Sequence, residues 1–278
     1  MVTFSKGGIL ARPMRERELV LVRRAETDDH RLEDISDPEV LEVVGAGIMK
    51  SKSARSAPDL LGLRHTLEPV EPRFFRDVES IAETRASNRD RSPLRGRTDP
   101  PLSNRGRQQA AALAAWFDDP SPTMLVTSPR RRAVETGDPI ARRHGVAMTI
   151  DPRLDDLDYG GWTGRDDVGL SGGWPALYEQ YLRTPEHVVF PGGEAVTGAQ
   201  ERAWQIMMEL SSIDRSERVV VITHEAILRL IVCRVLHVPL AKMHDMRFAP
   251  ASTTGFRVRA GAPVVEWLDA PTDVGHAR

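Results

Sequence analysis

Short runs of apolar, mostly β-branched residues alternate along the chain with longer stretches of helical spacing. Three runs are typical of buried parallel strands, and a weaker fourth follows; they occupy residues 19–22, 124–127, 219–223 and 147–150. Helices are expected after three of the runs, at 103–117, 131–144 and 225–236, the first of them capped by Ser103. This alternation predicts an α/β fold, a three-layer sandwich with a mainly parallel central sheet. Ligands of such sheets bind beyond the carboxyl ends of the strands.

Two long stretches interrupt this rhythm. Residues 30–98 are rich in charged residues, Ser and Pro, and residues 166–198 form a second excursion. Ordinary connections in compact domains run to about a dozen residues, so we expect 30–98 to be a cap or lid inserted into one domain that spans 1–278, or else partly disordered. Substrate identity would depend on residues 30–98 and 166–190, and neither segment has a sequence pattern that identifies a substrate.

Composition limits the classes of partner. The net charge is only −2 over 278 residues, so the sequence predicts neither nucleic-acid binding nor membrane binding. The N-terminus lacks the apolar core of a signal peptide, and no stretch approaches 18 uninterrupted apolar residues, which favours a cytoplasmic protein. The single cysteine, Cys233, lies in an apolar run and is expected to be buried. No metal-ligand cluster and no nucleotide fingerprint is present, so no cofactor is predicted.

Basic residues follow the predicted strands at the points where they end. Arg23 and Arg24 follow the first run, Arg132 lies shortly after the second, and His224 directly follows the strongest run. Because the carboxyl ends of parallel strands meet at one edge, these side chains are expected to surround a common point. Guanidinium groups match phosphate oxygens in a bidentate manner, and helix N-termini add amide donors. The sequence therefore predicts a phosphate-sized anion site.

The order of these motifs resembles the histidine phosphatase (phosphoglycerate mutase-like) superfamily. The resemblance covers about 19–28 and 94–260 and rests on Leu-Val-Arg23-Arg24-Ala25-Glu26-Thr27, Asp99 with Pro101-Leu102-Ser103, Ser128 to Thr136, Leu154 to Gly164, Pro191-Gly192-Gly193-Glu194 and Thr223-His224. It implies the phosphoglycerate mutase-like fold, with Arg23 and Arg132 as phosphate-binding arginines. In that family a histidine of the first motif attacks phosphorus, a second histidine stabilises the transferring group, and an acid protonates the leaving oxygen.

Two positions depart from the family pattern. Arg24 stands where the nucleophilic histidine is expected, and a guanidinium has no available lone pair for attack. The acid position holds Asp156, one methylene shorter than Glu, with Asp155 and Asp158 as alternatives. His224 is the obvious replacement nucleophile by location, and further histidines lie in the insertion at His30 and His65. The resemblance thus assigns catalytic roles to His224, Asp156 and Arg24, and phosphate binding to the same arginine and histidine with Arg23 and Arg132.

Three functions remain open on this basis. The first is an enzyme that binds and hydrolyses a small phosphorylated metabolite by rerouted or weakened chemistry. The second is a non-phosphoryl acid–base enzyme, a lyase or isomerase acting on an anionic substrate. The third is a pseudophosphatase that binds a phosphate ligand or a protein. A homodimer is compatible with all three, since an inserted cap can serve as a dimer surface.

Overall fold

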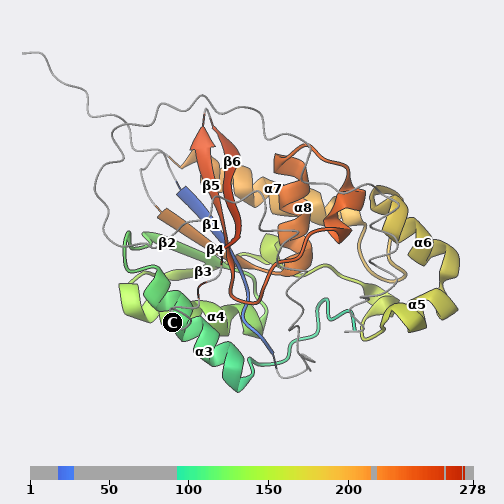
Figure 1. Cartoon of the computed structure of the whole chain (residues 1–278), viewed down its shortest axis with the longest axis horizontal. Coiled ribbons are helices and arrows are strands. Elements are labelled where there is room, and N and C mark those ends of the chain that lie inside the picture. The colour runs from blue at the N-terminus through green and yellow to red at the C-terminus, as the bar shows by residue number, and fades with distance from the viewer. Residues whose placement is uncertain (1–17, 28–92, 214–217, 260, 271, 273–278) are drawn as a thin grey trace, which may run out of the picture. The chain divides into compact units, whose positions relative to one another are not determined.

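The computed structural model describes residues 18–27, 93–213, 218–259, 261–270 and 272. One six-stranded sheet organises this part of the chain (Figure 1), in the order β3-β2-β4-β1-β5-β6. The predicted runs form the four parallel strands, which are β1 (Glu18–Arg23), β2 (Met124–Thr127), β3 (Met148–Ile150) and β4 (Arg218–Thr223). The strands β5 (Thr253–Arg259) and β6 (Ala262–Ala270) are antiparallel; β5 pairs with β1, and β6 forms the edge of the sheet.

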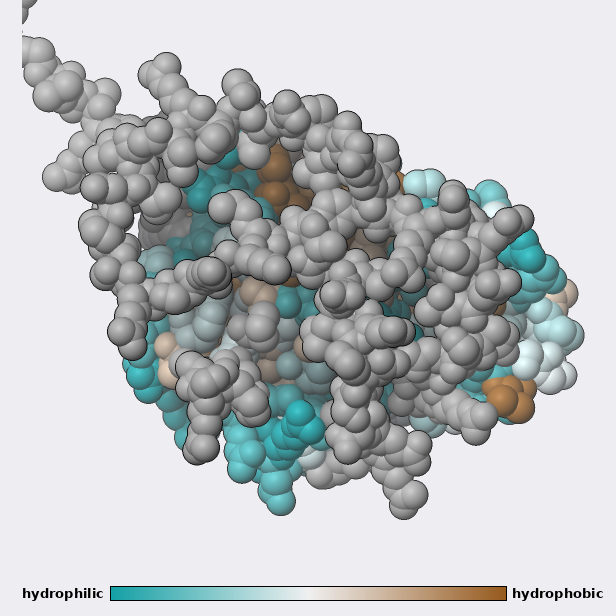
Figure 2. All heavy atoms as spheres, in the orientation of Figure 1, coloured by the Kyte–Doolittle hydropathy of each residue, from teal (hydrophilic) through white to brown (hydrophobic). Residues whose placement is uncertain are grey.

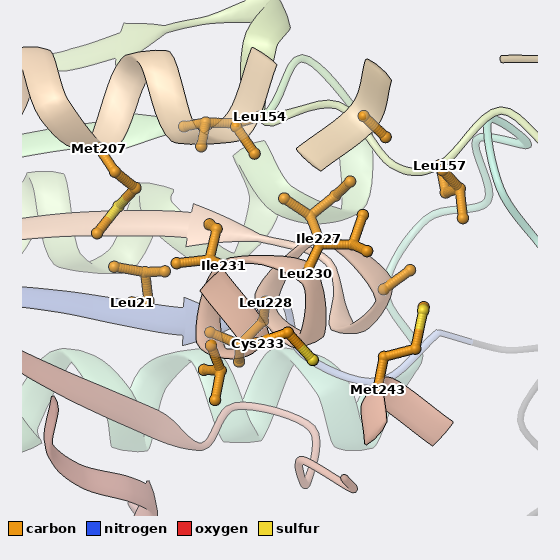
Figure 3. Packing of buried hydrophobic residues seen from close by; sticks show 14 of the residues in the cluster. Leu21, Leu154, Leu157, Met207, Ile227, Leu228, Leu230, Ile231, Cys233 and Met243 are labelled. Carbon is orange, nitrogen blue, oxygen red and sulfur yellow. The ribbon is translucent and has the colours of Figure 1, made fainter. Parts of the chain in front are cut away.

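The helices cover both faces of the sheet, as the alternation of elements predicts. Alternate residues of the central strands explain the layers: Val20 of β1 packs with the cluster beneath α3 (Asn104–Trp116) and α4 (Arg131–His144), whereas Leu21 packs on the other side with α7 (Val196–Ser212) and α8 (Glu225–Val235). Figure 3 shows the second cluster, where Leu21 lies near Ile231 and Met207. The predicted three-layer α/β fold is therefore confirmed.

The helix ends follow the local sequence. Ser103 caps α3, since its Oγ accepts a hydrogen bond from the amide of Gly106 at 2.9 Å. A Cβ on Gly106 would lie 1.9 Å from the carbonyl oxygen of Glu26, so only glycine allows the helix to approach the end of β1 this closely. The opposite surface of α3 is hydrophilic in the space-filling view (Figure 2), as expected of an amphipathic helix on the outside of a sheet.

The second excursion contains α5 (Asp167–Gly173) and α6 (Pro175–Arg183). Helix α6 packs against Trp162 through Tyr181, whose ring centroid lies 5.7 Å from that of Trp162, and the ring centroid of Phe190, which follows α6, lies 5.1 Å from that of Trp162. No helix in the described ranges is long and apolar enough to cross a membrane. Cys233 is buried in α8, as expected.

The predicted cap at 30–98 falls largely on residues 28–92, which lie outside the described residues together with His30 and His65. Its final residues, 93–98, are described. They lie beside the start of α4, which follows β2. The carbonyl oxygens of Gly96 and Thr98 accept hydrogen bonds from Arg132 there.

Candidate functional site

The side chains predicted to converge do so at the carboxyl ends of β1, β2 and β4. Arg24 follows β1, and its amide donates to the carbonyl of Thr223, the last residue of β4, at 3.0 Å. His224 comes next in the chain and is 1% exposed. Arg132 lies in the first turn of α4, just beyond β2, and is completely buried. The sheet therefore places an imidazole and two guanidinium groups at one edge.

Asp156 joins Arg132 to His224. Its Oδ2 accepts a hydrogen bond from Arg132 Nη2 at 2.9 Å and lies 3.5 Å from His224 Nδ1. Burial raises the pKa of Asp156, and the Arg132 cation opposes that rise only in part. The carboxyl group is thus easier to protonate than an ordinary aspartate, which suits a group that donates a proton.

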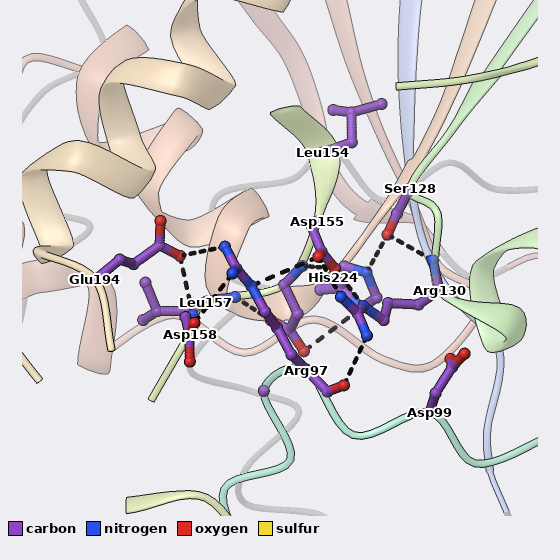
Figure 4. Close-up of polar contacts among 12 residues, drawn as sticks. Arg97, Asp99, Ser128, Arg130, Leu154, Asp155, Leu157, Asp158, Glu194 and His224 are labelled. Atoms are coloured by element: carbon purple, nitrogen blue, oxygen red, sulfur yellow. Dashed lines mark hydrogen bonds and ion pairs between the residues drawn. The ribbon is translucent and has the colours of Figure 1, made fainter. Parts of the chain in front are cut away.

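The two alternative acids are engaged elsewhere. Asp155 forms a bidentate pair with Arg130, with distances of 2.6 Å and 2.5 Å, as Figure 4 shows. Burial favours the protonated form of Asp155, but the Arg130 hydrogen bonds hold its pKa below the ordinary value. Asp158 binds Arg97 at 3.0 Å and the amide of Gly160 at 3.0 Å. Of the three carboxylates, Asp156 is the one in contact with Arg132 and His224.

The segment that carries these carboxylates is held from α7. Arg202 donates to the carbonyl oxygens of Asp155 at 2.7 Å and Asp156 at 3.1 Å. Glu194, from the Pro-Gly-Gly-Glu turn, binds the same guanidinium at 2.7 Å and accepts from the amide of Asp158. Gly160 has a φ of +51°, and a Cβ at this position would lie only 2.3 Å from the carbonyl oxygen of Pro191, so glycine is required here. The turn and the helix therefore fix the position of Asp156.

Arg24 is buried and forms no ion pair with a carboxylate among the described residues. Its Nη1 donates to the carbonyl oxygen of Ala25 at 3.0 Å. Burial, followed by the charges of Arg23 and Arg132, lowers the pKa of Arg24 to about 9. The guanidinium therefore stays a cation at neutral pH, and among the described residues the charge of Asp156 favours this cation without forming an ion pair with it.

Arg23 has a different environment from Arg24. Its guanidinium binds Glu225 Oε2 at 3.1 Å and also donates to the carbonyl oxygen of Phe248. Arg23 Nε, Arg132 Nε and His224 Nδ1 are buried without a hydrogen-bond partner in the described structure. A buried polar nitrogen left without a partner is costly, and an anion in this place would supply the missing oxygen atoms.

His224 is held by Ser128, a residue that the sequence pattern alone did not single out. Ser128 Oγ lies 2.7 Å from His224 Nε2, and Figure 4 shows both side chains beside Arg130. Burial and the Arg132 and Arg24 cations lower the pKa of His224 well below its ordinary value. The imidazole is therefore neutral at physiological pH. The position of Ser128 directly after β2, as the first residue of the Ser-Pro motif, was the available signal.

No group of three or more His, Cys, Asp or Glu side chains suited to a metal ion occurs among the residues for which the structure gives positions.

The sequence-family model of the histidine phosphatase superfamily (branch 1) matches residues 82–270 of this chain. The chain belongs to this superfamily.

Individual relatives of the superfamily agree with this assignment. Phosphoserine phosphatase 1 of Hydrogenobacter thermophilus is 28% identical over 147 residues, which is 53% of this chain and 70% of the relative. A glucosyl-3-phosphoglycerate phosphatase of Mycolicibacterium vanbaalenii is 26% identical over 159 residues, 54% of this chain and 69% of the relative.

Solved structures show the same fold. The alpha-ribazole phosphatase of Shigella flexneri superposes with a TM-score of 0.62 at 17% identity, covering 91% of this chain and 96% of that chain. A mycobacterial glucosyl-3-phosphoglycerate phosphatase in complex with VO3 superposes with a TM-score of 0.61 at 19% identity, covering 91% and 99%. At these identities the likeness establishes the phosphoglycerate mutase-like fold.

Proposed function

We propose that this protein binds a small phosphorylated metabolite by its phosphoryl group, at the edge of the sheet where Arg24, Arg132 and His224 meet. The observation that carries the proposal is the buried Arg24 cation, which has no carboxylate partner among the described residues. Phosphate monoesters are dianions, and guanidinium is the side chain whose geometry fits their oxygens best. The relatives named above are phosphatases, which supports a phosphorylated ligand.

Each residue has a role in this proposal. Arg132 and Arg24 bind phosphoryl oxygens, Arg23 contributes through Nε, and His224 donates from Nδ1. Asp156 lies beside Arg132 and His224, where a protonated carboxyl can donate to a leaving oxygen. The charges are fixed before the ligand arrives, so stabilisation of the transferring group costs little reorganisation.

The same geometry limits the chemistry. In-line attack needs a nitrogen lone pair on the residue that follows Arg23, and the Arg24 cation offers none. A phosphoenzyme at position 24 therefore does not form. We propose water, in place of His224, as the nucleophile of hydrolysis, with Arg24 as a binding group instead of a reacting one. We expect such turnover to be slow compared with phosphohistidine chemistry.

The test measures phosphate release and anion binding on the unmodified protein and on Arg24→His. Substrates are p-nitrophenyl phosphate, phosphoserine and glucosyl-3-phosphoglycerate; binding of phosphate and vanadate is followed by thermal shift. We expect both proteins to bind millimolar phosphate and the variant to release phosphate faster. Absence of anion binding by the unmodified protein would refute the proposal.

Two other outcomes separate the alternatives. Binding without release by either protein would leave a pseudophosphatase. Conversion of an anionic substrate without phosphate release, lost in His224→Ala, would establish the non-phosphoryl enzyme instead.

A further inference from the structure

Ser128 and His224 form a buried hydrogen bond at the ends of neighbouring strands. Ser128 follows β2, His224 follows β4, and the distance from Ser128 Oγ to His224 Nε2 is 2.7 Å. Ser128 is completely buried. Water therefore does not compete for this hydrogen bond, and the neighbouring protein groups determine which of the two atoms is the donor.

The hydrogen-bond partners of Ser128 settle its role. Its Oγ accepts a hydrogen bond from the amide of Arg130 at 3.3 Å, which occupies one lone pair of the hydroxyl oxygen. A hydroxyl has a single proton to donate. In the described part of the chain, the acceptor within hydrogen-bond distance of that proton is His224 Nε2. If Nε2 carried the proton instead, the buried Ser128 proton would be left without an acceptor.

The other ring nitrogen lies near the carboxyl group of Asp156. His224 Nδ1 is buried, has no hydrogen-bond partner in the described ranges, and lies 3.5 Å from Asp156 Oδ2. A lone pair on Nδ1 would point toward the electron pairs of that oxygen, whereas an N–H on Nδ1 points its positive end toward it. A neutral imidazole carries a proton on only one of its two ring nitrogens. The contacts of Nε2 and those of Nδ1 therefore have to fit the same tautomer.

We infer that Ser128 is a positioning residue that donates its hydroxyl proton to His224 Nε2 and so holds the imidazole as the Nδ1–H tautomer. In this tautomer His224 presents an N–H donor to a phosphoryl oxygen without carrying a charge itself. With the opposite tautomer, the Nδ1 lone pair would repel the same oxygen. The role for the phosphoryl group rests on the function proposed above, but the tautomer does not.

The test begins with the ligand-free protein. With 15N-labelled histidine, two-bond proton–nitrogen correlation spectra distinguish the protonated from the unprotonated ring nitrogen, and His224→Gln identifies the signal among the eight histidines of the chain. We expect His224 to be protonated at Nδ1 at neutral pH. A proton on Nε2 overturns the inference, and this measurement needs no variant of Ser128 to fold.

Variants then test the role of the hydroxyl. Ser128→Ala removes the donor, and Thr127→Val is the matched control, because Thr127 is equally buried and its Oγ1 contacts the backbone carbonyl of Ser128 instead of His224. Ser128→Ala should populate the Nε2–H tautomer and weaken phosphate binding about 3- to 10-fold, the worth of one hydrogen bond. Thr127→Val should keep the Nδ1–H spectrum. An unchanged tautomer in Ser128→Ala contradicts the role of the hydroxyl.

The two proposals fail separately. An Nδ1–H spectrum in a protein that does not bind millimolar phosphate would refute the proposed function and leave the tautomer assignment standing. Phosphate binding by a protein with an Nε2–H imidazole would refute the inference alone.

Discussion

Arg23 and Glu225 form an ion pair across the ends of two parallel strands, with Arg23 Nη2 3.1 Å from Glu225 Oε2. Arg23 is the last residue of β1, and Glu225 is the first residue of α8, directly after His224. The guanidinium expected to bind phosphate is therefore partly neutralised in the absence of ligand. Burial favours the protonated form of Glu225, but the Arg229 and Arg23 cations hold its pKa below the ordinary value, so the pair is ionised at neutral pH.

Removing this carboxylate should strengthen anion binding. In Glu225→Gln the Arg23 cation is free to bind the ligand, and we expect phosphate affinity to rise roughly tenfold, about 1.4 kcal/mol. The ligand-free variant should be less stable, because the buried Arg23 cation has lost its partner. Thermal shift with increasing phosphate measures both effects.

Arg229 provides the control for this variant. It pairs with the other oxygen of Glu225 from the next turn of α8. Arg229→Gln should lose that partly buried ion pair without a gain in phosphate affinity, since Arg23 keeps its carboxylate. Equal or lower affinity in Glu225→Gln would show that Arg23 does not contact the anion.

Arg132 should be essential for anion binding. The residue is completely buried and its Nε has no partner among the residues with described positions, so Arg132→Ala removes at least one charge-assisted hydrogen bond to the ligand and one cation from the site. Hydrogen bonds to charged groups contribute about 1.5–3 kcal/mol each, which predicts a loss of phosphate affinity of about 10- to 150-fold.

The neighbouring Arg131 is a matched control for Arg132. Its side chain is 60% exposed and pairs with Glu135 along α4. Isothermal titration of phosphate should therefore give almost the same affinity for Arg131→Ala as for the unmodified protein. If Arg132→Ala also kept its affinity, the anion site would have to lie elsewhere.

The central sheet follows from the sequence because its strands are short, apolar on both faces and bounded by polar residues. The β4 run at 219–223 was placed to within one residue of the strand Arg218–Thr223. Strands β5 and β6 were not predicted. β6 lies at the edge of the sheet with β5 beside it, and both mix polar with apolar residues, so their sequences show no clear alternation of buried and exposed positions.

The site was predictable in its composition but not in its contacts. Arg24, Arg132 and His224 could be grouped because strand ends meet at one edge, and Asp156 because the motif aligns. The Ser128–His224 hydrogen bond and the Arg23–Glu225 ion pair depend on the side-chain conformations of distant residues. No periodicity or spacing encodes those.

The buried Arg24 cation should lower the stability of the ligand-free protein while it favours ligand binding. A buried cation without a carboxylate partner is unfavourable, so Arg24→Met should raise the free energy of unfolding of the ligand-free protein by about 1–3 kcal/mol. The melting temperature would then rise about 2–4 °C for each kcal/mol, and added phosphate would no longer raise it further.

Arg183→Met is the comparison for this trade-off. Its side chain is 76% exposed and pairs only weakly with Glu179 along α6. The melting temperature should change little, and stabilisation by phosphate should persist. A lower melting temperature for Arg24→Met would mean that the cation is compensated in the folded protein.

His224 should make stability depend on pH in the mildly acidic range. Burial, followed by the Arg132 and Arg24 cations, lowers its pKa well below the ordinary value of 6.5. Below about pH 6.5, His224 therefore binds a proton in the unfolded chain but not in the folded protein. The free energy of unfolding should fall as the pH falls, by up to about 1.4 kcal/mol per pH unit from this group, until the pKa of the folded state is reached.

Urea unfolding of the unmodified protein and of His224→Gln, between about pH 7 and pH 5, isolates this contribution. The difference between the two free energies should shrink or change sign toward the acidic end, because glutamine does not titrate. His187→Gln, which replaces a histidine exposed on the surface, should keep the pH dependence of the unmodified protein. If the curve of His224→Gln instead stayed parallel to that of the unmodified protein, the imidazole would be able to take up a proton in the folded state. It would then enter the site as a cation, and the neutral Nδ1–H donor would have to be abandoned.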